Sequence, residues 1–192
     1  MRRPLLLLLA GLLALTGCSS LESAGDKGFV TGDGQVTRLA SDDRAAPIEF
    51  RGEDLDGRPL TLSEFRGEPL VVVVWGSWCA PCRAEAPDVV AAADELEGEA
   101  AVVGLNIRDP SPAQAQAFVR TFDVPYRSFY SPDGKAMLPF QGVLTPNSIP
   151  SFVVLDADGR VAASIIGELP SRDTLVELTR DVAGRTEGTA RG

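Results

Sequence analysis

A short apolar stretch that leads directly into a pair of cysteines is the feature that most constrains this chain. Residues 70–75 read Leu-Val-Val-Val-Val-Trp, a continuous β-branched run typical of a strand buried on both faces of a sheet. Cys79 and Cys82 follow within Trp-Cys-Ala-Pro-Cys, and a helical pattern then continues to about residue 97, closed by Gly98. This order predicts an α/β domain in which two cysteines stand where a buried strand passes into a helix.

The position of the two cysteines indicates redox chemistry. At a helix N-terminus the unpaired backbone N–H groups and the positive end of the helix dipole favour a thiolate, so we expect Cys79 to be the attacking thiol. Cys82 lies one turn further on the same face, close enough to displace a mixed disulfide and form an intramolecular bond. Pro81 is tolerated between them because its missing N–H falls in the first turn. Cys79 and Cys82 are therefore the predicted catalytic pair.

Composition and cysteine spacing argue against several competing functions. The 192 residues include no histidine, so this chain alone supplies no Ser-His-Asp triad, Cys-His dyad or His-ligated metal. Half a zinc site needs two further ligands, and without a second C-x-x-C we expect no metal. A purely structural disulfide would close so short a loop that it would restrict the unfolded chain little. The net charge of −9, without a stripe of Lys and Arg, argues against nucleic-acid binding.

The N-terminus has the composition of an export signal. Two arginines precede an apolar run of about 11 residues, too short for the ~20 that cross a bilayer. Residues 15–20, Leu-Thr-Gly-Cys-Ser-Ser, resemble the lipobox of bacterial lipoproteins, which implies cleavage before Cys18 and attachment of diacylglycerol to it. A plain signal peptide with a chance cysteine is the alternative. We predict a lipoprotein signal peptide over residues 1–17, a lipidated Cys18 with a flexible tether over 18–46, and a location on the extracytoplasmic face of the cell membrane, where disulfides persist.

The remainder of the chain predicts a mixed sheet with helices on both faces. An Asp-Gly turn between alternating residues indicates a hairpin, and apolar runs indicate central strands. The domain is expected over residues 47–183, followed by a disordered tail at 184–192. The expected elements are a short strand at 35–37, a β-hairpin at 48–62, a capped helical turn at 63–67, strands at 70–75 and 101–107, helices from 82 or slightly earlier to 97 and from 111 to 122, an antiparallel pair at 151–155 and 161–166, and a closing helix at 171–182.

With these motifs the sequence resembles the TlpA/ResA-like membrane-anchored thiol-disulfide oxidoreductases, most closely their actinobacterial lipoprotein members. The resemblance runs from about residue 47 to 182 and implies a thioredoxin-like fold with an N-terminal β-hairpin and a central insertion near residues 106–147. It also implies a cofactor-free reductant of disulfides in exported proteins, often apocytochrome c, that a membrane thiol carrier recharges. The residues that carry the resemblance are Trp78-Cys79-Ala80-Pro81-Cys82, Glu85, Pro87 and Ile149-Pro150.

The family pattern implies a groove for the substrate polypeptide beside the cysteines. Pro150 is expected to be cis and to pack beside the disulfide, while the backbone of Ile149 offers hydrogen bonds to the bound polypeptide. Trp78 is expected to border the groove together with Ala80 and Pro81. The alternatives are an ordinary proline at the start of a strand and a tryptophan of the core.

Glu85 is the candidate proton carrier. It lies one turn beyond Cys82 on the same helix face, whereas the strand position at which thioredoxin keeps a buried Asp is here the apolar Val73. We expect Glu85 to be partly buried, to have a raised pKa and to shuttle the proton of Cys82. The alternative is a solvated helix glutamate.

Two other functions remain open from the sequence. Peroxiredoxins share the fold, although their Pro-x-x-x-Thr/Ser-x-x-Cys setting is missing before Cys79. A tethered binding module with an incidental dithiol is the alternative without enzymatic activity. Between oxidation and reduction, the absence of a histidine between the cysteines favours a reducing or intermediate potential.

Overall fold

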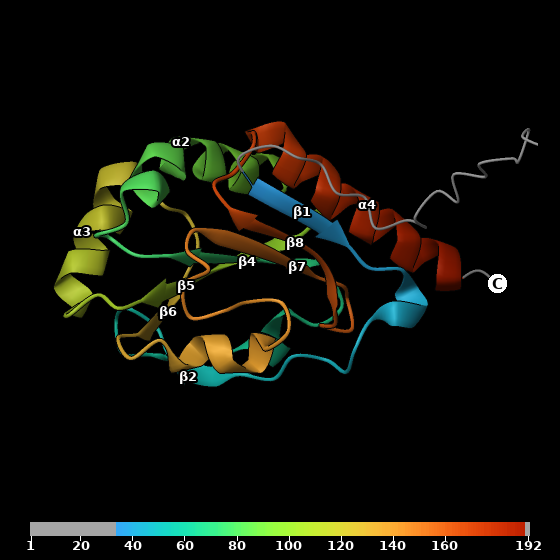
Figure 1. Cartoon of the computed structure of the whole chain (residues 1–192), viewed down its shortest axis with the longest axis horizontal. Coiled ribbons are helices and arrows are strands. Elements are labelled where there is room, and N and C mark those ends of the chain that lie inside the picture. Colours follow the sequence, from blue (N-terminus) through green and yellow to red (C-terminus); the bar gives the residue numbers. More distant parts are fainter. Residues whose placement is uncertain (1–33, 191–192) are drawn as a thin grey trace, which may run out of the picture.

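A six-stranded mixed β-sheet forms the centre of the molecule (Figure 1). The computed structural model describes residues 34–190, with side chains up to residue 184. The strand order is β1-β8-β7-β4-β5-β6, and every residue of β4 is buried, as expected for a strand covered on both faces. The strands are β1 (Gly34–Arg38), β4 (Leu70–Trp75), β5 (Ala101–Ile107), β6 (Ser128–Ser131), β7 (Ser151–Leu155) and β8 (Val161–Gly167).

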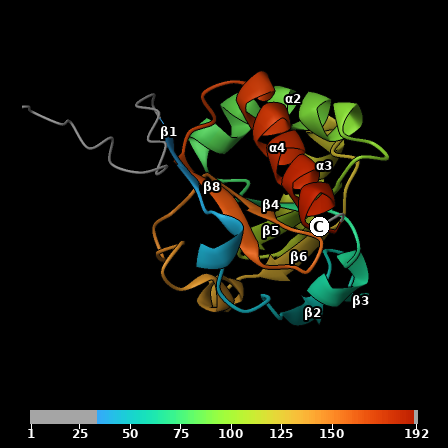
Figure 2. The ribbon, with the colours of Figure 1, turned by 90° about the vertical axis from the view of Figure 1, so that its right-hand side faces the viewer.

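Three α-helices cover one face of this sheet and shorter elements cover the other (Figures 1 and 2). The crossovers from β4 to β5 and from β5 to β6 join parallel strands and step in the same direction, and right-handed connections of this kind place both helices on one face. Helices lie on both faces of the sheet, as expected, but the face opposite the α-helices carries only short 3-10 helices among the described residues. The helical elements are α2 (Ala80–Glu95), α3 (Pro112–Phe122), α4 (Arg172–Ala190), η1 (Ser41–Asp43), η2 (Leu62–Phe65) and η3 (Lys135–Phe140), and the hairpin consists of β2 (Arg51–Glu53) and β3 (Pro59–Thr61).

Successive side chains of β4 enter two separate apolar cores. Val71, Val73 and Trp75 pack under the α-helices, whereas Val72 and Val74 pack against the hairpin and η3. This division follows from the two-residue period of a strand. The chain therefore reaches the cysteines from β4, a strand that packs against both cores.

The folded part of the chain begins before residue 47, the predicted start of the domain. β1 pairs antiparallel with β8 and places Val36 in the core with 3% of its surface exposed. Arg44 forms an ion pair with Asp156 at 3.0 Å in which the two side chains are 2% and 1% exposed. The predicted short strand at 35–37 is thus an edge strand of the main sheet, and residues 34–46 belong to the domain.

The other departures from the predicted elements are local. The sequence pattern missed β6 and η3, which lie in the predicted central insertion. α2 begins at Ala80, in agreement with the predicted start at residue 82 or slightly earlier, whereas α4 continues to Ala190, past the predicted end at residue 182. The signal peptide, Cys18 and the tether as far as residue 33 lie outside the described residues. Within residues 34–190 no helix has the length and apolar character that crossing a bilayer requires.

Candidate active site

Cys79 and Cys82 form a disulfide at the start of α2. Cys79 is the N-cap residue, and its Sγ accepts a hydrogen bond from the backbone N–H of Cys82 at 3.2 Å. The free N–H groups of a helix's first turn stabilise a thiolate at this position once the bond is reduced. The predicted pairing and its place at the helix N-terminus are confirmed. Among the described residues, no three Cys, Asp or Glu side chains gather as a possible metal site.

The loop that contains Ile149 and Pro150 lies at the same end of the sheet as the cysteines. The bond between Ile149 and Pro150 is cis, as predicted. Ser151 pairs with Val74, near the end of β4 from which the chain reaches Cys79. The carbonyl oxygen of Pro150 accepts a hydrogen bond from the N–H of Gly167 at 3.0 Å, which ties the loop to β8.

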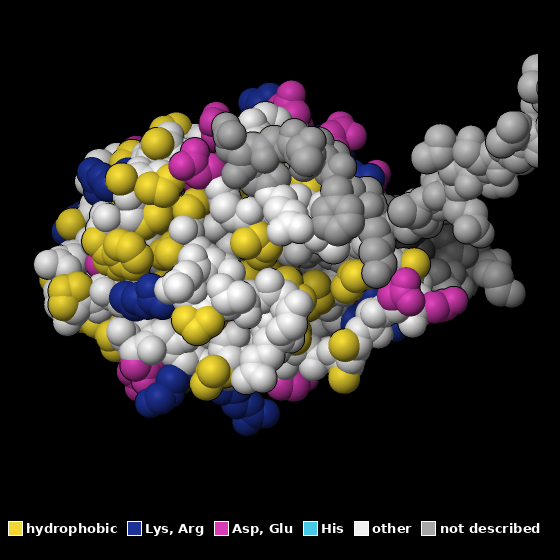
Figure 3. Space-filling model, viewed as in Figure 1, with side chains coloured by type: hydrophobic (Ala, Val, Ile, Leu, Met, Phe, Trp, Pro, Cys, Tyr) yellow, Lys and Arg dark blue, Asp and Glu magenta, His cyan; other side chains and the backbone are white. Residues whose placement is uncertain are grey.

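An apolar surface surrounds the attacking cysteine. Trp78 is 48% exposed, although its indole Nε1 donates a hydrogen bond to the carbonyl oxygen of Ile107 at 3.2 Å. Ala80 is exposed and Pro81 is partly exposed, whereas Cys79 is only 4% exposed. Figure 3 shows hydrophobic side chains gathered over α3 and the beginning of α2, with charged side chains mainly at the rim. The side chains exposed on either side of Cys79 in the sequence, Trp78 and Ala80, are therefore apolar.

Glu85 is a half-buried acid one helical turn after Cys82. Burial raises the pKa of Glu85 to about 7, against the effect of a hydrogen bond that its Oε2 accepts from the N–H of Leu169 at 2.9 Å. The negative charges of Glu168 and Asp88 raise this pKa further. The predicted partial burial and raised pKa are both present.

A small apolar cavity joins Glu85 to Cys82. Tyr126, from the loop after α3, forms one wall of it, and no sequence motif points to this residue. Burial and the negative charge of Glu85 raise the pKa of Tyr126 well above its ordinary value. Few polar groups share this cavity with the acid, so the charged form of Glu85 is poorly solvated there. The lining residues are Val73, Trp75, Cys82, Glu85, Ala86, Val89, Phe118, Val124 and Tyr126.

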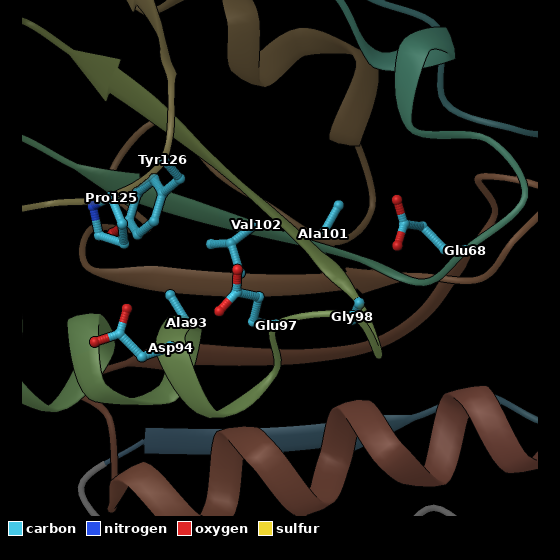
Figure 4. A pocket seen from close by; sticks show the side chains of 10 residues that line it. Glu68, Ala93, Asp94, Glu97, Gly98, Ala101, Val102, Pro125 and Tyr126 are labelled. Carbon is cyan, nitrogen blue, oxygen red and sulfur yellow. The ribbon is translucent and has the colours of Figure 1, made fainter.

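A larger pocket of about 380 Å³ lies at the other end of the sheet (Figure 4). It is bounded by the end of α2 and by the beginning of β5, with acidic side chains at its rim. The cysteines lie at the opposite end of α2, and Tyr126 lines both this pocket and the small cavity beside Glu85. The lining residues are Glu68, Ala93, Asp94, Glu97, Gly98, Ala100, Ala101, Val102, Pro125 and Tyr126.

Comparisons with known proteins agree with this site. The redoxin family profile matches residues 40–180. The thiol:disulfide interchange protein HelX of Rhodobacter capsulatus is 31% identical over 174 residues, which are 85% of this chain and 92% of HelX. The thiol-disulfide oxidoreductase ResA of Bacillus thuringiensis is 26% identical over 82% of this chain and 89% of its own length. The crystal structure of a DsbF homologue from Corynebacterium diphtheriae has a TM-score of 0.72 and 30% identity, covering 81% of this chain and 98% of that one.

Proposed function

Since this chain belongs to the redoxin family, as a thiol-disulfide oxidoreductase, we propose that it reduces disulfide bonds of exported proteins outside the cytoplasmic membrane. The observation that carries the proposal is the Cys79–Cys82 disulfide at the N-terminus of α2, at the same end of the sheet as the cis bond before Pro150. The absence of a histidine between the cysteines favours the reducing direction.

The reaction begins from the reduced protein and transfers two electrons. The Cys79 thiolate attacks one sulfur of the substrate disulfide, forms a mixed disulfide and expels the other substrate sulfur as a thiolate, which takes a proton from water. Cys82 gives its proton to Glu85 and attacks the Cys79 sulfur. The second substrate sulfur leaves as a thiolate and is protonated in turn. The substrate becomes a dithiol, and the protein is left with the disulfide seen in the structure.

Glu85 is suited to take the proton of Cys82 because of its place and its pKa. The two side chains line one apolar cavity, so the proton has a short path between them. A general base works best when its pKa lies near the operating pH, and the pKa of Glu85 is about 7. An ordinary exposed glutamate would hold a proton too weakly at neutral pH to play this role.

The substrate is proposed to bind as an extended polypeptide across the end of the sheet. The apolar surface of Trp78, Ala80 and Pro81 would receive its side chains. The carbonyl oxygen of Ile149 would accept a hydrogen bond from its main chain, since the N–H of Ile149 already donates to the carbonyl oxygen of Asn147 at 2.9 Å. Trp78 is the strongest candidate for an anchor because it combines 48% exposure with a fixed indole ring. Apocytochrome c is the proposed physiological substrate, by resemblance to the TlpA/ResA-like proteins.

The proposed location is the extracytoplasmic face of the cell membrane, held by lipid on Cys18. This part of the proposal depends on the sequence at residues 15–20 alone. A membrane thiol carrier would return two electrons and two protons to the disulfide after each cycle. Growth with a radiolabelled fatty acid tests the anchor: label should enter the wild-type chain and be lost in Cys18→Ala, and label retained in that variant would refute it.

Reduction of a disulfide-bonded peptide by the dithiol form of the exported chain tests the activity. We expect one peptide disulfide reduced per protein molecule in a single turnover, and no reduction by Cys79→Ser. Hydrogen peroxide added in place of the peptide distinguishes the peroxiredoxin alternative. Rapid oxidation by peroxide with no peptide reduction would refute the proposal in favour of a peroxidase, and no reaction with either would favour a binding module.

A further inference from the structure

The loop before the attacking cysteine is fastened to the end of β5. We call residues 76–78 the redox loop. The N–H of Cys79 donates a hydrogen bond to the carbonyl oxygen of Gly76 at 3.1 Å, which closes the loop into a turn. The indole of Trp78 donates to the carbonyl oxygen of Ile107. The conformation that presents Cys79 is therefore set partly by the residues that follow β5.

A buried carboxylate makes the strongest of these attachments. Asp109 is 0% exposed, and its Oδ2 accepts a hydrogen bond from the backbone N–H of Ser77 at 2.9 Å. Its Oδ1 accepts the hydroxyl of the same serine. The side-chain Nδ2 of Asn106 donates to Oδ2 at 2.6 Å. All three donors are uncharged, and together these directed hydrogen bonds fix the position of Ser77.

The backbone around Asp109 is shaped to serve the redox loop. Arg108 has a φ of 59°, a left-handed conformation that is uncommon for a residue other than glycine. Because of this turn, the Ile107 carbonyl and the Asp109 carboxylate both face the redox loop. The hydroxyl of Tyr130 donates to the Asp109 carbonyl oxygen at 3.0 Å and ties the turn to β6.

Asn106 supports the same carboxylate at a cost to stability. It is 0% exposed, and within residues 34–190 its Oδ1 has no hydrogen-bond partner. An apolar residue at this central strand position would leave no unpaired polar atom. Local arrangements that reduce stability are typical of functional sites, which agrees with a role of the Asn106–Asp109 pair in the reaction.

We propose that Asp109 is a positioning residue for disulfide exchange: by holding Ser77, it fixes Trp78 and the Cys79 backbone in the geometry from which Cys79 attacks. The inference rests on the proposed role of Cys79. The thiolate must approach the substrate disulfide from a defined direction, and misplacement of a reacting group by about 1 Å can slow a reaction on the order of 100-fold. The Asp109 side chain is fully buried and its hydrogen bonds go to Ser77 and Asn106, so it acts through the loop.

The test compares isosteric variants of the reduced exported chain. We expect Asp109→Asn, which keeps the shape but replaces an acceptor with a donor, to slow single-turnover reduction of a disulfide peptide by about 10- to 100-fold. Ser77→Ala should slow it less, and Ser77→Thr, which keeps the hydroxyl, should restore the rate. The double variant Ser77→Ala/Asp109→Asn should be no slower than Asp109→Asn, because both changes break the same attachment.

Asp156→Asn is the matched control. Asp156 is also buried and accepts N–H groups, those of Asp158 and Arg160, but it follows Leu155, which pairs with Leu70 at the other end of β4. Asp156→Asn should melt at a lower temperature than the wild type, but below that temperature it should reduce the disulfide peptide at the wild-type rate. Alkylation by iodoacetamide, which needs a thiolate but no aligned disulfide, should change less than about threefold in Asp109→Asn.

Three results would overturn the inference. They are a wild-type rate in Asp109→Asn, an equal loss of rate in the Asp156 control, and a loss of alkylation rate parallel to the loss of exchange rate. A failure of the proposed function looks different, because the wild-type chain itself would then reduce the peptide no faster than Cys79→Ser.

Discussion

Replacing Glu85 with glutamine should make the protein more stable at high pH and slower in catalysis. Burial raises the pKa of this carboxyl from 4.5 to about 7, so between these pH values the folded state binds more protons than the unfolded state. Stability therefore falls as pH rises from about 4.5 to 7 and stays low above that range. The amide that Glu85→Gln introduces carries no charge at any pH, so the variant should lose this pH dependence.

The expected gain in the free energy of unfolding follows from the shift in the pKa of Glu85. At about 1.36 kcal/mol per pKa unit, a shift from 4.5 to about 7 corresponds to roughly 3 kcal/mol, and partial exposure of the side chain reduces this to about 1–2 kcal/mol. Glu85→Gln should thus exceed the wild type by that amount at pH 8 and equal it at pH 4. Loss of the general base should slow resolution by Cys82 on the order of 100-fold.

Urea unfolding of the oxidised proteins at pH 4 and pH 8 measures the first effect, and single-turnover release of the reduced peptide measures the second. Glu168→Gln is the control: it removes a neighbouring negative charge that raises the Glu85 pKa, so its pH–rate profile should move slightly to lower pH while its maximum rate is retained. Identical pH profiles of stability and rate in wild type and Glu85→Gln would refute the assignment of Glu85.

Three further substitutions test the fold and the substrate surface. Arg44→Ala should lower the free energy of unfolding in urea by about 1.5–3 kcal/mol, because the buried carboxylate of Asp156 loses one of its two arginine partners and keeps Arg160; a loss below about 0.5 kcal/mol would place residues 34–46 outside the domain. Gly104→Ala should destabilise by about 1–3 kcal/mol, since an added Cβ would overlap the Ser128 hydroxyl, and an unchanged melting temperature would contradict this. Trp78→Ala should slow reduction of a peptide disulfide up to about tenfold, but not of a small-molecule disulfide, and equal losses with both would argue against a polypeptide-binding role.

The parts of the fold that local sequence determines were predictable. β4 is one such part, because a strand buried on both faces needs a continuous apolar run. α3 is another, because Ser111 and Pro112 mark its start and the apolar period continues to Phe122. The redox pair also belongs here, since the spacing between the cysteines is enough to place both sulfurs in one helical turn.

The parts that depend on distant contacts were not predictable. β6 has only four residues and becomes a strand through pairing with β5, so the local sequence shows no alternation long enough to predict it. The sequence around β1 predicts a tether because the strand forms only by pairing with β8, which lies far away in the sequence. Tyr126 and Asp109 reach the site only through the folded chain, and nothing in their immediate sequence distinguishes them from surface residues.

The most direct test of the mechanism is to identify which cysteine forms the mixed disulfide with a substrate. Cys82→Ser, reduced and mixed with a disulfide-bonded peptide, should accumulate a mixed disulfide that mass spectrometry locates on Cys79, because the resolving thiol is gone. Cys79→Ser should accumulate none, because Cys79 is the N-cap residue of α2, where free N–H groups favour a thiolate, whereas Cys82 lies within the helix. Adducts on Cys82 in Cys79→Ser, at a rate equal to those on Cys79, would contradict the assignment of Cys79 as the attacking thiol and with it the proposed mechanism.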